Sequence, residues 1–144
     1  MGMTAFDLHA AVREFHDKFG CVNGDSPAFR QAGLRTSLID EELNELIDAI
    51  ADSDLIAAAD ALGDLLYVVM GSFLAFGIDP NPVIAEVHRS NMTKEGGGTR
   101  ADGKILKGPG YSPPDLKRVI RDQLSDLPDR GTGGHGSTGM DGAK

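Results

Sequence analysis

The stretch that decides the fold runs from Leu34 to Phe76: LRTSLIDEELNELIDAIADSDLIAAADALGDLLYVVMGSFLAF. Its apolar residues recur at helical spacing on both sides of a break at Asp52-Ser53-Asp54, where a new N-cap is available. The pattern predicts one helix from about Leu34 to Ala51 and a second from about Leu55 to Phe76. Because the break is short, we expect these two helices to form an antiparallel hairpin.

The segments that flank this hairpin also carry helix signals. Thr4 is suited to cap a first helix that stops at Gly20, and Asp79-Pro80 starts another that runs to about Asn91. Asp115 is suited to cap a last short helix that ends near Leu124. The helix after the break is apolar nearly all round, so we expect it to be central and buried.

These signals predict an all-α fold, an antiparallel helical bundle of four to five helices in a single domain over residues 1–124. An apolar helix offers more surface than one copy can cover, so we expect oligomerisation, as a homodimer or a dimer of dimers, to complete the bundle. The Gly- and Pro-rich segment 95–114 should be an irregular basic loop. Residues 125–144 are Gly-rich and polar and should form a disordered tail.

Composition narrows the functional classes. The chain has 144 residues, a formal net charge of −8 and a pI near 4.8, which argues against a nucleic-acid polymer or a membrane surface as partner. A single cysteine, Cys21, excludes an intrachain disulfide and favours a cytoplasmic location. We expect no signal peptide at the N-terminus and no apolar run long enough to span a bilayer.

The hairpin carries an unusual charge pattern. Between Glu41 and Asp64 there are eight carboxylates and no Lys or Arg. They gather as Glu41-Glu42-x-x-Glu45 before the break and Asp60-x-x-x-Asp64 after it, and residues three or four apart share a helix face. Two acidic patches brought together in a helical pair repel each other unless a cation lies between them.

The carboxylates therefore predict a divalent-metal site for phosphate chemistry. Mg²⁺ prefers oxygen ligands, and it commonly takes a few carboxylates together with water and substrate phosphate oxygens. We expect the metal ligands to be Glu42, Glu45, Asp60 and Asp64. Glu41, next to a ligand, is the candidate to orient or deprotonate the attacking water.

A basic segment follows the acidic hairpin. Between His88 and Lys107 there are five Lys or Arg residues and two acids, so this segment is suited to contact β and γ phosphates. Asn91 presents both a donor and an acceptor, which suits a sugar hydroxyl or a base edge. His16 and His88 are alternative bases, but we expect His16 to decorate the first helix and His88 to serve structure or a partner.

These motifs together resemble the MazG-like and phosphoribosyl-ATP pyrophosphohydrolase superfamily of all-α nucleoside triphosphate pyrophosphatases. The likeness covers roughly residues 5 to 122 and rests on five segments: Leu38–Leu46, Ala61–Val69, Gly77–Asp79, Glu86–Lys94 and Asp102–Lys107. It implies hydrolysis between the α and β phosphates by an obligate oligomer that uses Mg²⁺ or Mn²⁺. By the same resemblance, the substrate-binding candidates are Arg89, Asn91, Lys94 and Lys107, and Lys104 of the basic segment is a further candidate.

The chain departs from the family signature at one position. The signature has a Glu three residues before Asp64, where this chain has Ala61, and Asp60 stands beside it. A shorter carboxylate moved by one position can still reach a metal if the helix rolls slightly, so Asp60 remains a predicted ligand. The departure leaves the number of metals open.

The leading interpretation is a nucleotide pyrophosphohydrolase that converts a (deoxy)nucleoside triphosphate to the monophosphate and pyrophosphate. Candidate substrates by resemblance are dUTP and dGTP or GTP. The alternatives are a phosphoribosyl-ATP pyrophosphohydrolase, a non-catalytic relative that binds nucleotide or metal, and a plain helical oligomerisation module. The last of these leaves the acidic clusters unexplained.

Overall fold

The computed structural model describes residues 5–126, and within them it is all-helical, as predicted. Its five helices are α1 (Leu8–Phe19), α2 (Ala32–Ala51), α3 (Leu55–Ala75), α4 (Pro80–Asn91) and α5 (Leu116–Ser125). The one β-type pairing among these residues is an isolated antiparallel bridge between Thr99 and Ile105. Residues 127–144, which hold most of the predicted disordered tail, lie outside the described part of the chain.

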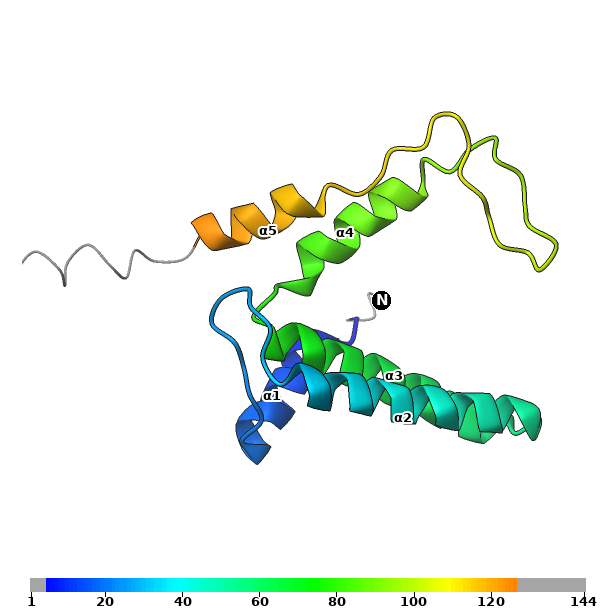
Figure 1. The fold of residues 1–144 in the computed structure, drawn as a ribbon. Helices are drawn as coiled ribbons and strands as arrows, with labels where there is room; N and C mark the ends of the chain where they lie inside the picture. Colours follow the sequence, from blue (N-terminus) through cyan, green and yellow to red (C-terminus); the bar gives the residue numbers. More distant parts are fainter. Residues whose placement is uncertain (1–4, 127–144) are drawn as a thin grey trace, which may run out of the picture.

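Helices α2 and α3 form the predicted antiparallel hairpin (Figure 1). Asp54 caps α3, because its Oδ1 accepts a hydrogen bond from the Ala57 amide at 3.0 Å. Three small residues, Ala49, Ala58 and Ala61, are buried along the seam between the helices. Small side chains let two helix axes approach closely, and this brings the polar residues further along the same faces within reach of one another.

Helix α1 packs against α3 and covers one end of the hairpin. Val12 and His16 of α1 are buried. The Phe15 ring of α1 meets the Tyr67 ring of α3 edge to face, with 5.5 Å between their centroids. The N-cap of α1 is Asp7, whose Oδ1 accepts from the Ala10 amide. The prediction of Thr4 as that cap is therefore wrong, because the helix begins one turn later and Asp7 supplies the same kind of acceptor.

Helices α4 and α5 form an arm that extends away from the hairpin (Figure 1). Asp79 caps α4 and Asp115 caps α5, as the sequence predicted. The buried Glu86 carboxylate joins the two helices: it accepts from Arg89 at 2.8 Å and from the Asp115 amide at 2.8 Å, and it lies 3.5 Å from Arg118. Further hydrogen bonds join the arm, between Gln123 of α5 and the Asp79 backbone and from Ser90 Oγ of α4 to the Ser112 carbonyl.

The single chain leaves much of α3 bare, so the prediction that this helix is buried is wrong for one copy. Leu55 and Ile56 are 83% and 85% exposed, and Leu66 is 61% exposed. Helix α3 is also long and apolar enough, by length and composition, to cross a membrane, with a mean hydropathy of 1.5 in its most apolar window. The prediction that no apolar run could span a bilayer is wrong on those two criteria.

Candidate functional site

The hairpin brings carboxylates from both helices into one small volume. Glu42 and Glu45 of α2 and Asp64 of α3 each offer an oxygen, and these atoms lie within 4.8 Å of one another. The i, i+3 spacing places the two glutamates on the same face of α2, and the antiparallel pairing places Asp64 opposite them. The structure therefore assembles three of the four predicted metal ligands.

Glu42 is the least solvated member of this cluster. Its Oε2 atom is buried and has no hydrogen-bond partner among the described residues. Burial raises the pKa of the Glu42 carboxyl, and the nearby charges of Glu45, Asp64 and Asp60 raise it further. A buried acceptor without a donor is unfavourable, so the position calls for a cation or a proton.

The two other predicted acidic residues lie beside the cluster. Asp60 is exposed one turn before Asp64 on α3, and its charge acts on Glu42, but it is outside the set within 4.8 Å. Glu41 is exposed and also outside that set. Ala61, where the family signature has a glutamate, is 2% exposed. In this chain a methyl group therefore packs between the two helices, and the neighbouring carboxylate, Asp60, lies at the edge of the cluster.

The structure gives Arg89 a different setting from the one predicted for a free phosphate ligand. Its guanidinium donates to Glu86, to Ser112 Oγ at 3.1 Å and to the Pro113 carbonyl at 3.1 Å. The Glu86 partner raises the pKa of Arg89 and holds its charge in place. Most of the donors of Arg89 are thus engaged in hydrogen bonds that join α4 to the end of the loop before α5.

The remaining substrate-binding candidates lie at the far end of the arm. Lys104 and Asn91 are exposed, Lys94 is half-buried, and the Lys107 ammonium lies over the Tyr111 ring, 4.7 Å from its centroid. Figure 1 shows the loop between α4 and α5 separated from the α2–α3 hairpin. Within one chain, the basic loop and the carboxylate cluster do not meet.

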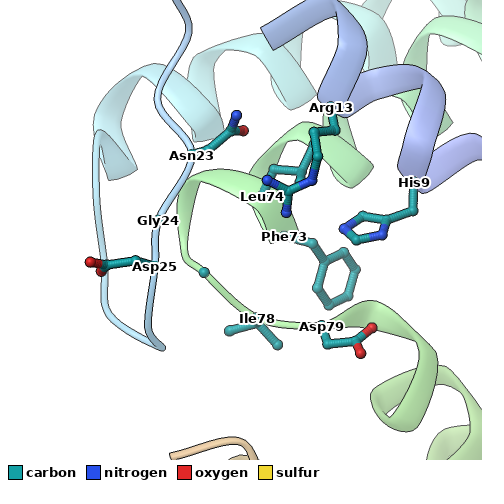
Figure 2. A pocket seen from close by; sticks show the side chains of 10 residues that line it. His9, Arg13, Asn23, Gly24, Asp25, Phe73, Leu74, Ile78 and Asp79 are labelled. Atoms are coloured by element: carbon teal, nitrogen blue, oxygen red, sulfur yellow. The ribbon is translucent and has the colours of Figure 1, made fainter. Parts of the chain in front are cut away.

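Two of the hollows beside the hairpin are also lined by α1. The first, about 490 Å³, opens where α1 faces the link between α3 and α4, with His9, Arg13, Phe73 and Asp79 around it (Figure 2). The second, about 410 Å³, lies between α1, α2 and α3, and Leu38 and Val68 are on its wall. Each of these two residues is one helical turn from a carboxylate of the cluster, Glu42 and Asp64 respectively, so the second hollow adjoins the cluster.

Sequence reasoning missed Arg35, a buried residue of the second hollow. The residue is 5% exposed, and its guanidinium donates from Nε to Ser72 Oγ at 3.1 Å and from Nη2 to the Val68 carbonyl at 2.8 Å. A signal was present, because Arg35 is the single Lys or Arg between Leu34 and Phe76 and shares the inner face of α2 with Leu38 and Glu42.

The fold and the site together define the class of protein: an all-α protein whose acidic cluster is built by the two helices of a hairpin. Comparison with known proteins gives the family. The sequence model of phosphoribosyl-ATP pyrophosphohydrolase matches residues 12–91, and this chain belongs to that family, part of the MazG-like all-α superfamily. Membership supports a nucleotide pyrophosphohydrolase type of function in general.

A viral relative is also similar. An uncharacterized protein of Acanthamoeba polyphaga mimivirus is 50% identical over 80 residues, which cover 49% of this chain and 31% of the viral protein. The match thus spans about a third of the length of that relative. Its name gives no activity.

Proposed function

We propose that this protein is a metal-dependent nucleotide pyrophosphohydrolase that cleaves a (deoxy)nucleoside triphosphate to the monophosphate and pyrophosphate. The observation that carries the proposal is the meeting of Glu42, Glu45 and Asp64 within 4.8 Å around a buried Glu42 oxygen that has no donor in the described chain. Three negative charges at that separation are stable together only if a cation or protons neutralise them.

Each residue of the site has a defined task in this proposal. Glu42, Glu45 and Asp64 would hold Mg²⁺ or Mn²⁺, with Asp60 at the rim as a further ligand. The bound ions would supply Lewis-acid stabilisation of the charge that develops on the phosphate oxygens. Glu41 lies next to a ligand and outside the cluster, where its carboxylate can orient or deprotonate a water molecule.

The basic loop enters the proposal through a second copy of the chain. Lys94, Lys104, Lys107 and Asn91 lie away from the cluster of their own chain, while the uncovered face of α3 offers a surface for self-association. We propose a homodimer or dimer of dimers in which the loop of one copy reaches the phosphates held by another. Arg89 would support that loop, since its donors are engaged with Glu86, Ser112 and Pro113.

A covering copy also fits α3 better than lipid does. Asp60 and Asp64 lie within the apolar stretch, and carboxylates in the hydrocarbon region of a bilayer are costly. The proposal therefore includes no membrane as partner. It also includes no nucleic-acid polymer, and it places the enzyme in the cytoplasm.

Pyrophosphate release across a substrate panel tests the activity. The panel holds the canonical dNTPs, dUTP, GTP and phosphoribosyl-ATP, each with Mg²⁺, with Mn²⁺ and with a chelator. We expect metal-dependent release of pyrophosphate and monophosphate from one or more (deoxy)nucleoside triphosphates. Turnover of phosphoribosyl-ATP alone would replace the proposed substrate class, and metal-independent turnover would contradict the metal site.

The variant Glu42→Gln tests the assignment of the cluster. It keeps the size of the side chain but removes the charge, and we expect kcat to fall at least ~100-fold because a charged metal ligand is lost. Asp48→Asn, an exposed acid on the same helix outside the cluster, is the control and should retain wild-type turnover. Circular dichroism should show equal helix content in both variants. Full turnover by Glu42→Gln would contradict the metal assignment.

A further inference from the structure

Arg35 is a buried cation that has no carboxylate partner among residues 5–126. Its hydrogen bonds within the described residues go from Nε and Nη2 to a hydroxyl and a backbone carbonyl. The third nitrogen, Nη1, donates to no described residue. Burial lowers the pKa of the Arg35 guanidinium, and the nearby Cys21 opposes that effect. Nη1 is not among the buried side-chain atoms that lack a partner in the described chain, so it is accessible and can donate to an electron-rich group in the hollow that Arg35 lines.

The hollow beside Arg35 has the character of a ligand pocket. Its volume of about 410 Å³ lies within the range of small-molecule sites, and its walls include Phe15, Leu34, Leu38 and Tyr67. Aromatic and aliphatic walls suit a flat heterocycle better than a multiply charged phosphate. Arg35 supplies the polar contact that such a pocket uses to orient its ligand.

Its position relative to the carboxylate cluster matches the order of parts in a nucleotide. Arg35 and Glu42 lie on the same face of α2, seven residues apart, which corresponds to ~10 Å along the helix. Leu38 lies between them, opposite Val68 of α3. Phosphates at the cluster would therefore place the sugar over Leu38 and Val68 and the base beside Arg35.

His16 supplies an acceptor next to this donor. Its Nδ1 lies 3.0 Å from two oxygens, the Val22 carbonyl and Asn23 Oδ1, while the Asn23 amide nitrogen donates to Asp17. Two acceptors at Nδ1 place the ring hydrogen there, which leaves Nε2 of the neutral ring as an acceptor. A Cβ at Gly71 would lie 3.0 Å from His16 Nε2 and would clash with Arg35 Nη2, so the two groups meet over this glycine.

We propose that this hollow takes the base of the nucleotide, with Arg35 donating to a carbonyl oxygen and His16 Nε2 accepting from the adjacent ring N–H. Uracil, thymine, guanine and hypoxanthine carry that edge, whereas cytosine and adenine carry an amino group beside an unprotonated ring nitrogen. The inference rests on the proposed function for the placement of the phosphates. It names the class of base, which the acidic cluster leaves open.

Cys21 provides a test that does not depend on hydrolysis. It lies on the wall of the hollow and is the only cysteine of the chain, so N-ethylmaleimide modification followed by mass spectrometry reports on this position alone. The probes are the α,β-imido analogues of dUTP and dCTP with Mg²⁺. We expect the dUTP analogue to slow modification at least tenfold and the dCTP analogue to leave the rate nearly unchanged at the same concentration.

The kinetic counterpart uses substitutions of Arg35. We expect the wild-type kcat/KM for dUTP to exceed that for dCTP, and for dITP to exceed that for dATP, by about ten- to a hundredfold, as for a lost hydrogen bond to a charged group. Arg35→Met should lower both ratios several-fold, with the remaining preference due to His16 Nε2, and Arg35→Lys should restore part of the loss. Arg13→Met, which removes an exposed cation at the other hollow, should leave both ratios unchanged.

The outcomes separate this inference from the proposed function. Pyrophosphate release without protection of Cys21 would overturn the inference and leave the activity standing, as would equal protection by both analogues. Selective protection without any hydrolysis would support the pocket and contradict the activity. Because the protection experiment uses the wild-type chain, the inference remains testable even if Arg35→Met fails to fold.

Discussion

Glu86 is the buried carboxylate that links α4 to the start of α5. Its carboxylate accepts hydrogen bonds from Arg89 and from the Asp115 amide, and these partners, with Arg89 the strongest, hold the pKa of Glu86 at about 2 instead of its usual 4.5. The residue is only 7% exposed. A buried carboxylate that is fully satisfied by donors fixes the geometry of α4, α5 and the loop between them.

The lowered pKa predicts how acid affects the fold. A carboxylate with a depressed pKa stabilises the native state above the pKa of the unfolded chain, and that contribution is lost as pH falls toward the native pKa. We therefore expect wild type to be more stable than Glu86→Gln at pH 7. The difference should shrink as the pH falls from about 4.5 to about 2. Urea unfolding of both proteins across this range measures it, and a difference that does not change with pH would contradict the role of the Glu86 charge.

At the same scale, the sequence showed which carboxylates belong together but not the surroundings of each side chain. The spacing of Glu42 and Glu45 predicted a shared helix face, and the structure places Asp64 opposite them. The engagement of Arg89 with Ser112 and Pro113 and the burial of Arg35 were not predicted, because each depends on a distant segment of the chain or on another helix. Residue type and spacing do not encode such contacts.

At the scale of the elements, the α2–α3 hairpin determines the site. Its two helices are joined by Asp52-Ser53-Asp54, and Ser53 adopts a left-handed conformation with φ of 51°. This tight turn fixes which residues of α3 lie opposite α2. A shift of one residue would rotate Asp64 by about 100° away from Glu42 and Glu45. The cap at Asp54 therefore positions the acidic cluster as well as starting a helix.

That cap gives a prediction at the element scale. Asp54→Ala removes the acceptor for the Ala57 amide, and we expect the free energy of unfolding to fall by ~1 kcal/mol, within a range of roughly 0.5–2. Asp52→Ala removes a neighbouring exposed acid whose side chain makes no such capping bond, and it should change stability by less than about 0.5 kcal/mol. Thermal unfolding monitored by circular dichroism compares the two, and equal effects would contradict the capping role.

At the scale of the whole molecule, the described part of the chain leaves many large apolar side chains exposed. Its buried apolar residues are few and small, whereas large side chains such as Ile47, Leu62 and Leu66 are half exposed or more. Exposed apolar surface of this extent is typical of a face that another copy covers. The separation of the basic loop from the carboxylate cluster has the same explanation under the proposed assembly.

A charged substitution on the exposed apolar face of α3 tests whether a second copy covers that face. If Leu66 is exposed to water in solution, Leu66→Asp should change stability by less than about 0.5 kcal/mol. If a second copy covers it, we expect dissociation of the oligomer and a melting temperature that no longer rises with protein concentration. Sedimentation velocity and concentration-dependent melting measure both effects, with Lys117→Asp on the exposed side of α5 as control. An unchanged oligomer in Leu66→Asp would contradict the covered face.

The sequence by itself determined the helices, their order, most of their caps and the acidic hairpin, because these follow from periodicity and capping chemistry between near neighbours in the chain. Only the tertiary structure decided that α3 is bare in one copy, that Arg89 serves the arm and that Arg35 and His16 meet at Gly71. The physical reason is that burial and hydrogen-bond partnership depend on the packing of distant segments, and a pattern of neighbouring residues does not contain that information.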